Sequence, residues 1–191
     1  MSKELFDEFP RLISDEITIR KMELTDVEAL EEICSNEAIF QYAPQFLYKN
    51  SKKLLETAIK NLGGRDFEKK RCIIGGIYLT TDPDRLVGMA EMFDYDKNLN
   101  MLTIGYKINE AYWNQGIATK AVSLMVHYLL KEVGVNRLQA FVMPENVAST
   151  KVLLKNGFTK EGVLRQANIW KGQGIVDLQV FSILQSDMQE A

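Results

Sequence analysis

The first half of the chain combines one strand-like pattern with two helix-like patterns of hydrophobic residues. Ile17 and Ile19 alternate with polar residues, which predicts a short strand. Thr25, with a glutamate three residues later, has the spacing of a helix-capping box. A second helix is predicted to begin after Ser51 and to end at the two glycines of residues 63–64. The apolar faces of these helices consist of Val27, Leu30, Ile33 and Cys34, and of Leu54, Leu55, Ala58, Ile59 and Leu62.

The second half of the chain is dominated by patterns typical of strands. Three apolar or alternating runs follow one another, and Asp82-Pro83-Asp84 predicts the turn between the first two. The predicted elements are strands over residues 72–80, 86–93 and 101–108, a helix over 117–133, a strand over 137–143, a short helix between Asn146 and Gly157, and strands over 158–169 and 175–184. The order β-α-α-β-β-β-α-β-α-β-β therefore predicts an α/β fold with one mixed, mostly antiparallel sheet flanked by helices.

The composition indicates one globular domain. Of the 191 residues, 46% are hydrophobic and 26% are charged, which is ordinary for a folded protein. We expect an irregular lead-in over residues 1–14, one domain over residues 15–186 and a tail over residues 187–191. An aromatic loop over residues 42–48 either covers the core or lines a substrate cleft.

Charge and cysteine content argue against several classes of function. The net charge of -3 provides no general attraction to nucleic acid, and the apolar runs are too short to span a membrane. The N-terminal residues lack the apolar core of a signal peptide. Cys34 and Cys72 have no metal-ligand spacing and the chain has a single histidine, so we expect no metal site and a reducing, cytoplasmic location.

The turn between the predicted strand over residues 101–108 and the helix that follows carries the candidate chemistry. A helix that begins after a glycine-bearing turn leaves several backbone N–H groups free, and its dipole favours an anion such as a phosphate. Gly116 lets the backbone approach a ligand closely, because it has no Cβ, and Ala118 keeps the next turn small. The same residues are also consistent with a tight turn that binds nothing.

Several motifs in this order resemble the GNAT superfamily of acetyl-CoA-dependent N-acetyltransferases, and in particular its RimJ/RimL-like branch. They are Ile104-Gly105-Tyr106, Trp113-Asn114-Gln115-Gly116-Ile117-Ala118-Thr119, Asn146-Val147-Ala148-Ser149 with Lys155-Asn156-Gly157-Phe158, and Glu161-Gly162-Val163-Leu164-Arg165 followed by Asp177. The resemblance implies a GNAT-like fold from about Ile17 to Leu184. It also implies acetyl-CoA as the cosubstrate, without a metal.

The resemblance assigns roles to individual residues. Backbone N–H groups near Tyr106, Lys107 and Ile108 would polarise the acetyl oxygen. The pyrophosphate would be held by Gln115, Gly116, Ile117, Ala118 and Thr119. Asn146 is either a helix N-cap alone or a cofactor and substrate contact as well, and Ser149 either faces solvent or donates to the cofactor sulfur. Asn146 and Ser149 are thus the candidate catalytic residues, and both are candidate cofactor contacts.

The chain departs from the family pattern at four positions. Trp113 stands where the general pattern has glutamine or arginine, and Lys120 where many relatives have glutamate. Leu153 occupies the position of the tyrosine that serves as leaving-group acid, and Asn168 that of a carboxylate. His127 is expected to be a packed or surface residue, so water ordered by Glu91 or Glu110 would accept the proton of the amine.

Three hypotheses about function follow. The first is an N-acetyltransferase that acts on a primary amine. The acceptor is either the N-terminal α-amine of a protein, such as a ribosomal one, or a small molecule, and the assembly is either a monomer or a homodimer. The second is a non-catalytic acyl-CoA sensor on the same fold, which the missing acid and base residues favour. The third is a mononucleotide-binding protein, which is weakened by the lack of Gly-Lys-Ser/Thr after Gly116.

Overall fold

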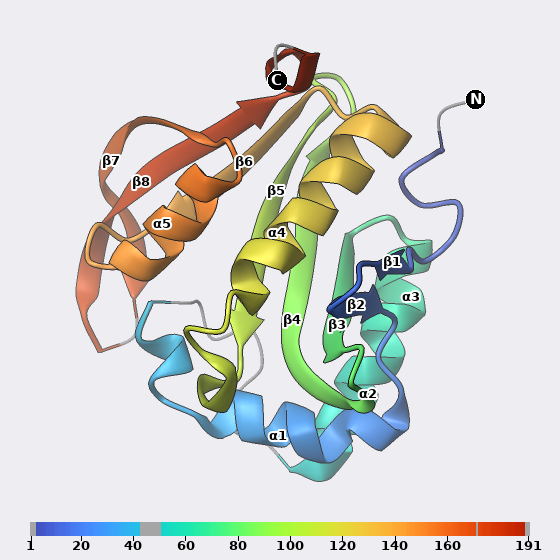
Figure 1. Cartoon of the computed structure of the whole chain (residues 1–191). Helices are drawn as coiled ribbons and strands as arrows, with labels where there is room; N and C mark the ends of the chain where they lie inside the picture. The colour runs from blue at the N-terminus through green and yellow to red at the C-terminus, as the bar shows by residue number, and fades with distance from the viewer. Residues whose placement is uncertain (1–2, 43–50, 171, 190–191) are drawn as a thin grey trace.

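One eight-stranded sheet lies at the centre of the structure, a computed structural model that describes residues 3–42, 51–170 and 172–189. Its strands are β1 (Leu12–Ile13), β2 (Ile17–Arg20), β3 (Cys72–Leu79), β4 (Asp82–Asp96), β5 (Met101–Ile108), β6 (Arg137–Val142), β7 (Thr159–Trp170) and β8 (Gly174–Leu184). They lie in the order β1-β2-β3-β4-β5-β6-β8-β7 (Figure 1). Neighbours are antiparallel except β5 and β6, which run parallel, so the predicted mixed, mostly antiparallel sheet is confirmed.

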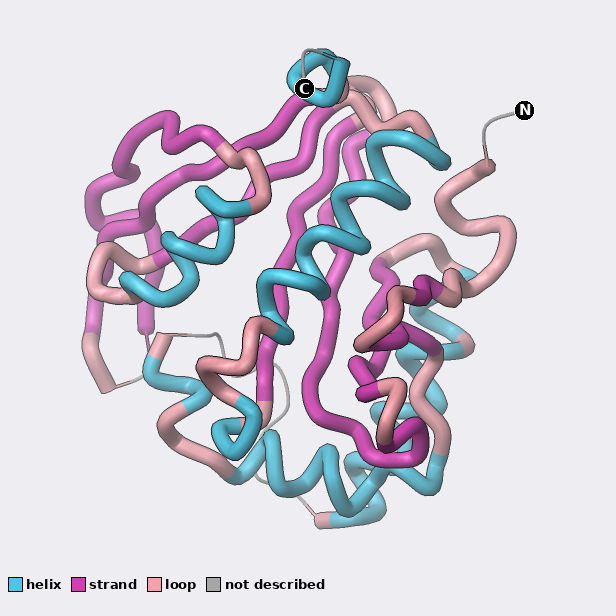
Figure 2. The backbone as a smooth tube through the Cα atoms, viewed as in Figure 1, coloured by secondary structure: helices cyan, strands magenta, loops and turns pink. Residues whose placement is uncertain are grey.

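Helices cover both faces of this sheet (Figure 2). The α-helices are α1 (Val27–Ser35), α2 (Lys52–Gly63), α3 (Arg65–Glu68), α4 (Ile117–His127) and α5 (Val147–Lys155), and a π-helix over Tyr128–Val133 continues α4. Helices α4 and α5 pack on one face, where Ile104, Met125 and Leu153 are buried. Helices α1 and α2 pack on the other face, where Leu30 and Leu55 are buried. The sheet therefore separates two hydrophobic cores.

The predicted order of elements is confirmed, with two short additions. Strand β1 precedes the first predicted strand, and α3 follows α2. Leu5 and Leu12, within the predicted lead-in, are buried in the core under α4. Residues 43–48 of the predicted aromatic loop lie outside the described residues.

Two local predictions are wrong. The turn between β3 and β4 lies at residues 80–81, and β4 begins at Asp82, because Leu79 pairs with Asp82 after a register irregularity that accommodates Pro83. The capping box lies earlier than Thr25. Asp26 Oδ2 accepts hydrogen bonds from the Glu23 N–H at 2.7 Å and from Tyr78 Oη at 2.6 Å. The capping box therefore belongs to the 3-10 helix over Leu24–Asp26, and α1 follows directly after Asp26 without a side-chain cap of its own.

The parallel strands β5 and β6 are paired along only part of their length. Their paired positions are Met101↔Arg137, Leu102↔Leu138 and Thr103↔Gln139. The last pair is also joined by a hydrogen bond from Gln139 Nε2 to Thr103 Oγ1 at 3.1 Å. Beyond it, β5 continues to Ile108 beside β4, and β6 continues to Val142 beside β8. The side of β5 that faces β6 is therefore unpaired beyond residue 104 within the described part of the chain.

A three-residue polar cluster joins the last strands to β6. Arg137 on β6 donates two hydrogen bonds to Glu161 on β7, at 2.7 and 2.6 Å. Ser182 Oγ on β8 donates to Glu161 Oε1 at 2.7 Å. Hydrogen bonds from Arg137 and Ser182 lower the pKa of Glu161 to about 2. The cluster thus crosses β8, which lies between the other two strands.

We expect Glu161→Gln to destabilise the protein at neutral pH and to lose this effect in acid. The folded-state pKa of Glu161 lies below its ordinary value, so its contribution is fully present above about pH 4.5 and is lost as pH falls towards about 2. Urea unfolding at several pH values measures this difference. Glu68→Gln, at an exposed glutamate of α3 with no ion-pair partner in the described residues, is the matched control. If Glu161→Gln changed the free energy of unfolding by the same amount at every pH, the lowered pKa assigned to Glu161 would be contradicted.

Candidate active site

The unpaired edge of β5 presents the backbone of two residues. The Asn109 N–H donates to the Val87 carbonyl of β4 at 2.9 Å. Backbone groups alternate in direction along a strand, so Lys107 also turns its N–H towards β4, and Tyr106 and Ile108 turn theirs towards β6. The Ile108 carbonyl accepts a hydrogen bond from Trp113 Nε1 at 2.8 Å. The tryptophan that departs from the family pattern therefore fixes the turn after β5 to the end of that strand.

The turn before α4 leaves donors free, as the sequence predicts. Gly116 is the N-cap residue, with a left-handed φ of 79° that favours glycine. Its carbonyl accepts from the Lys120 N–H at 3.1 Å. The N–H groups of Ile117, Ala118 and Thr119 have no acceptor within the described residues. Gln115 and Gly116 are exposed, so these donors lie next to solvent at the positive end of the helix.

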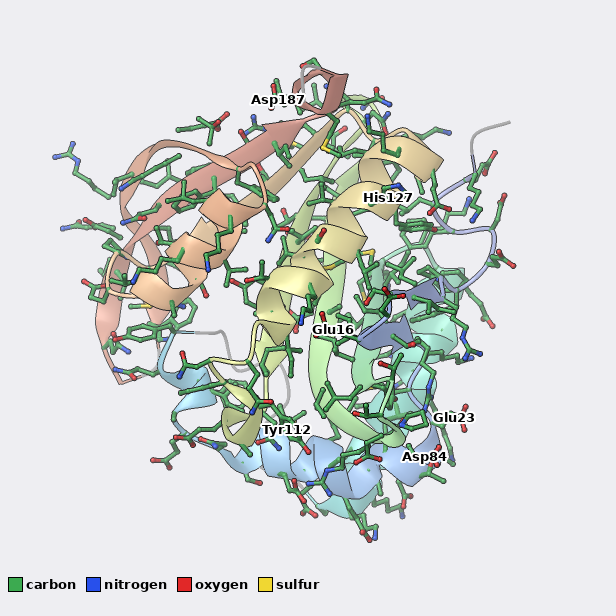
Figure 3. The ribbon with its side chains drawn as sticks, viewed as in Figure 1. Glu16, Glu23, Asp84, Tyr112, His127 and Asp187 are labelled. Atoms are coloured by element: carbon green, nitrogen blue, oxygen red, sulfur yellow. The ribbon has the colours of Figure 1, made fainter. Side chains whose placement is uncertain are left out.

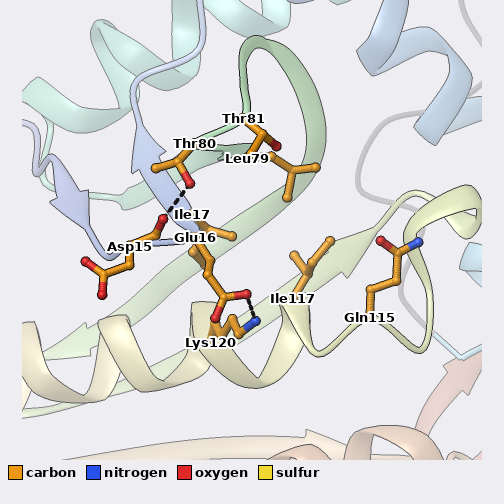
Figure 4. Close-up of a pocket in the computed structure, with 9 residues that line it drawn as sticks. All are labelled: Asp15, Glu16, Ile17, Leu79, Thr80, Thr81, Gln115, Ile117 and Lys120. Atoms are coloured by element: carbon orange, nitrogen blue, oxygen red, sulfur yellow. Dashed lines mark hydrogen bonds and ion pairs between the residues drawn. The ribbon is translucent and has the colours of Figure 1, made fainter.

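Lys120 adds a positive charge beside this turn. A Cβ placed on Gly116 would lie 3.9 Å from Lys120 Nζ. The lysine forms an ion pair with Glu16 at the edge of a pocket of about 200 Å³ (Figure 4). The family pattern has a glutamate at this position, whereas this chain places a cation beside the turn.

Helix α5 packs beside α4. Asn146 is its N-cap residue, and Asn146 Oδ1 accepts from the Ser149 N–H at 3.1 Å. At the other end of α5, Asn156 Nδ2 donates to the Thr119 carbonyl of α4 at 3.2 Å. Asn156 therefore ties the two helices together. Its bonding partner lies 37 residues away in the chain, and no local pattern identifies this role.

The side chain of Tyr106 approaches α5 from β5. Its ring packs against the core under α4, and its hydroxyl is buried without a hydrogen-bond partner in the described residues. Burial raises the pKa of Tyr106 to about 12, and the nearby Ser149 side chain acts in the opposite direction. Tyr106 and Ser149 are thus neighbours, although their hydroxyls do not form a hydrogen bond of ordinary geometry. The sequence indicated the backbone of Tyr106 but not this side chain.

An ion pair lies on the other face of β5. Lys107 Nζ donates to Glu91 Oε1 of β4, and the two side chains are 3% and 10% exposed. No other ion pair between side chains in the described residues is so deeply buried. A Cβ on Gly105 would lie 2.8 Å from Glu91 Oε2, so the glycine leaves room for this carboxylate over β5. Cys34 of α1 lies near Lys107, and burial raises the pKa of its thiol to about 11.

The remaining candidate acid and base positions either lie away from this region or have side chains that are already hydrogen-bonded or packed in the core. The His127 side chain is 65% exposed on the half of α4 distant from the turn at Tyr112 (Figure 3). Glu110 is exposed and accepts from Asn36 Nδ2 at 2.8 Å. Asn168 is exposed on β7, where its Oδ1 accepts from the Ile169 N–H at 2.8 Å. Leu153 is fully buried in the core.

Two classes of feature are not found in the described residues. No group of three or more histidine, cysteine, aspartate or glutamate side chains is arranged to hold a metal ion. No helix there is long and apolar enough to cross a membrane. Both cysteines, Cys34 and Cys72, are free thiols.

Comparison with known proteins identifies the family. The family model described as acetyltransferase (GNAT) domain matches residues 16–159. The uncharacterized N-acetyltransferase YoaA of Bacillus subtilis is 32% identical over 178 residues, which cover 92% of this chain and 97% of that protein. The ribosomal-protein-serine acetyltransferase of Escherichia coli is 24% identical over 161 residues, which cover 81% and 86% of the two chains.

The fold comparison agrees with this result. The microcin C7 self-immunity acetyltransferase MccE, solved in complex with acetyl-CoA and AMP, has a TM-score of 0.79 to this structure. It is 23% identical in sequence, and the match covers 90% of this chain and 93% of that one. The sheet of this protein, in which the parallel strands β5 and β6 separate beside α4, therefore has the fold of known acetyltransferases. The chain belongs to the GNAT acetyltransferase family, and its relatives include ribosomal-protein acetyltransferases, as the RimJ/RimL-like motifs predict.

We expect Lys107→Met to lower the free energy of unfolding by about 3–5 kcal/mol, because it leaves the Glu91 carboxylate buried without its partner. Adding Glu91→Gln to this variant should recover most of the loss, because the amide carries no charge. Urea unfolding of the two single variants, the double variant and the wild type forms a double-mutant cycle. A cost below about 1 kcal/mol for Lys107→Met would show that the pair behaves as an exposed one.

Proposed function

We propose that this chain transfers an acetyl group from acetyl-CoA to a primary amine, in the first place the N-terminal α-amine of a protein. One observation supports the proposal most strongly. Direct contacts join the unpaired edge of β5 to the turn before α4 and to the first turn of α5, and join the other end of α5 to α4. Trp113 links the turn to Ile108, Asn156 links α5 to Thr119, and Tyr106 reaches Ser149.

Each part of this arrangement suits one part of acetyl-CoA. Pantetheine would extend along β5 as an added strand, with its amides against the backbone of Tyr106 and Ile108. The pyrophosphate would lie at residues 115–119, where free N–H groups and the helix dipole favour negative charge, with Lys120 beside it. Asn146 and Ser149 would then lie at the thioester end. Bound at this site, acetyl-CoA supplies the activated acetyl group.

The amine must lose a proton during the reaction, and the chain offers one buried carboxylate near the site. Glu91 lies over Gly105. Gly105 directly precedes Tyr106, whose N–H faces the space between β5 and β6. Glu110 is exposed and already bonded to Asn36. We therefore assign Glu91 as the side chain that orders the water molecule to which the amine passes its proton. Lys107 holds this carboxylate in place.

The relatives support the proposed substrates. The ribosomal-protein-serine acetyltransferase supports a protein N-terminus as acceptor, and MccE supports acetyl-CoA as donor. A small-molecule amine is the second candidate acceptor. The free thiols of Cys34 and Cys72 support a reducing, cytoplasmic location. Exposed apolar side chains on β7 and β8, including Val163 and Ile175, support the proposed homodimer.

Thiol release from acetyl-CoA, measured across a panel of peptides and small amines, tests the function. We expect peptides with a free α-amine to be better acceptors than the same peptides blocked at the N-terminus. Because the proton passes to water, kcat/KM should rise with pH up to the pKa of the acceptor, near 8 for an α-amine and above about 10 for a lysine side chain. An inflection at one pH for every acceptor would instead indicate a protein base. Acetyl-CoA binding without thiol release would favour the non-catalytic sensor.

Substitution of Gly116 tests the phosphate site. We expect Gly116→Asp to weaken acetyl-CoA binding at least ~10-fold, since it places a negative charge beside the pyrophosphate. Gly116→Asn is the matched control, because asparagine has nearly the same shape without the charge, and both residues tolerate the left-handed backbone. Calorimetry measures affinity, and circular dichroism confirms that both variants fold. If the two variants bound acetyl-CoA with equal affinity, charge repulsion at the pyrophosphate would be ruled out as the cause of the weaker binding.

A further inference from the structure

The buried hydroxyl of Tyr106 has no hydrogen-bond partner of ordinary geometry among the described residues. Tyr106 Oη and Arg85 Nε are the two buried side-chain polar atoms that lack a hydrogen-bond partner in the described residues. Burying a hydroxyl without a partner costs free energy, and phenylalanine would fill the same space without this cost. A hydroxyl kept under these conditions indicates a partner that is bound only when the site is occupied.

The position of this hydroxyl limits what the partner is. Tyr106 belongs to the part of β5 that is unpaired towards β6, and its side chain reaches Ser149 in the first turn of α5. Two hydroxyls from different elements therefore lie together between the strand edge and the helix. The inference that follows rests on the proposed function, in which the pantetheine arm follows this edge and brings the thioester to α5.

We infer that the Tyr106 hydroxyl donates a hydrogen bond to the sulfur of the acyl-CoA thioester and stabilises the thiolate that departs. The amine nitrogen attacks the acetyl carbonyl carbon and forms the C–N bond. The C–S bond then breaks, and its electron pair stays on the sulfur. The amine proton leaves through water, and Tyr106 keeps its own proton while it donates to the sulfur. Ser149 is the second hydroxyl at this position.

The acidity of the two groups explains why Tyr106 donates a hydrogen bond without giving up its proton. Burial raises the pKa of Tyr106 to about 12, whereas a thiol has a pKa of about 8.5. Full transfer from the tyrosine to the thiolate is therefore unfavourable by a factor on the order of 10³. A hydrogen bond to a charged acceptor requires no such transfer. The helix position expected to carry an acid, Leu153, is filled by a buried apolar side chain, so the hydroxyl at this site comes from a strand.

The first part of the test is a binding measurement that needs no turnover. Coenzyme A and desulfo-coenzyme A differ in the sulfur alone, so the ratio of their affinities reports on the sulfur contact. Near pH 9, where a thiol with a pKa of about 8.5 is largely ionised, we expect the wild type to prefer coenzyme A on the order of 10-fold. Tyr106→Phe should reduce this preference to about 1. Tyr128→Phe removes a hydroxyl from another buried tyrosine, on the π-helix, and should keep the wild-type ratio.

The second part measures stability and turnover. Without ligand, Tyr106→Phe should be at least as stable as the wild type, because it removes an unpartnered polar atom. In the acetyl-transfer assay its kcat should fall on the order of 10- to 100-fold.

Different results overturn the inference and the proposed function. A lower thermal midpoint for Tyr106→Phe, or an unchanged affinity ratio, would overturn the role of the hydroxyl even if acetyl transfer is observed. If the wild type transfers acetyl to no amine but its affinity ratio depends on Tyr106, the proposed function fails and the sulfur contact stands.

Discussion

The parting of β5 from β6 is the constraint on which the rest of the site depends. Two parallel strands normally satisfy each other's backbone groups, yet here they are paired at three positions only. Each strand is held on its other side, β5 by β4 and β6 by β8, so the sheet stays intact while they separate. Unpaired backbone groups need another partner. The open edge is therefore a stable feature of the free protein and is suited to an extended ligand.

Three consecutive residues of β5 serve the two faces of the sheet in different ways. Gly105 leaves room for the Glu91 carboxylate, and Lys107 binds that carboxylate on the face covered by α1 and α2. Tyr106 points to the opposite face and carries its hydroxyl towards α5. A buried ion pair and an unpartnered hydroxyl both reduce stability relative to apolar side chains of similar size. Their concentration in one short segment is typical of a functional site.

The departures from the family pattern become understandable when the side chains are placed. Leu153 fills the core under α4, so the helix offers no acid at that position. Trp113 donates to the Ile108 carbonyl and orders the turn through a hydrogen bond. Lys120 contributes a cation beside Gly116. Trp113 and Lys120 therefore fit the backbone arrangement of the turn.

The sequence by itself determined the order of the main elements, the glycine turn and the N-cap of α5, but not the short elements β1 and α3. These features depend on residues close together in the chain: the period of apolar positions, a left-handed glycine at Gly116, and the bond from the Ser149 N–H to Asn146. Tertiary structure decided which polar side chains meet. The pairing of Glu91 with Lys107 spans 16 residues and that of Asn156 with Thr119 spans 37 residues. Such contacts, like the meeting of Tyr106 with Ser149, depend on strand register and helix packing, which no local period encodes.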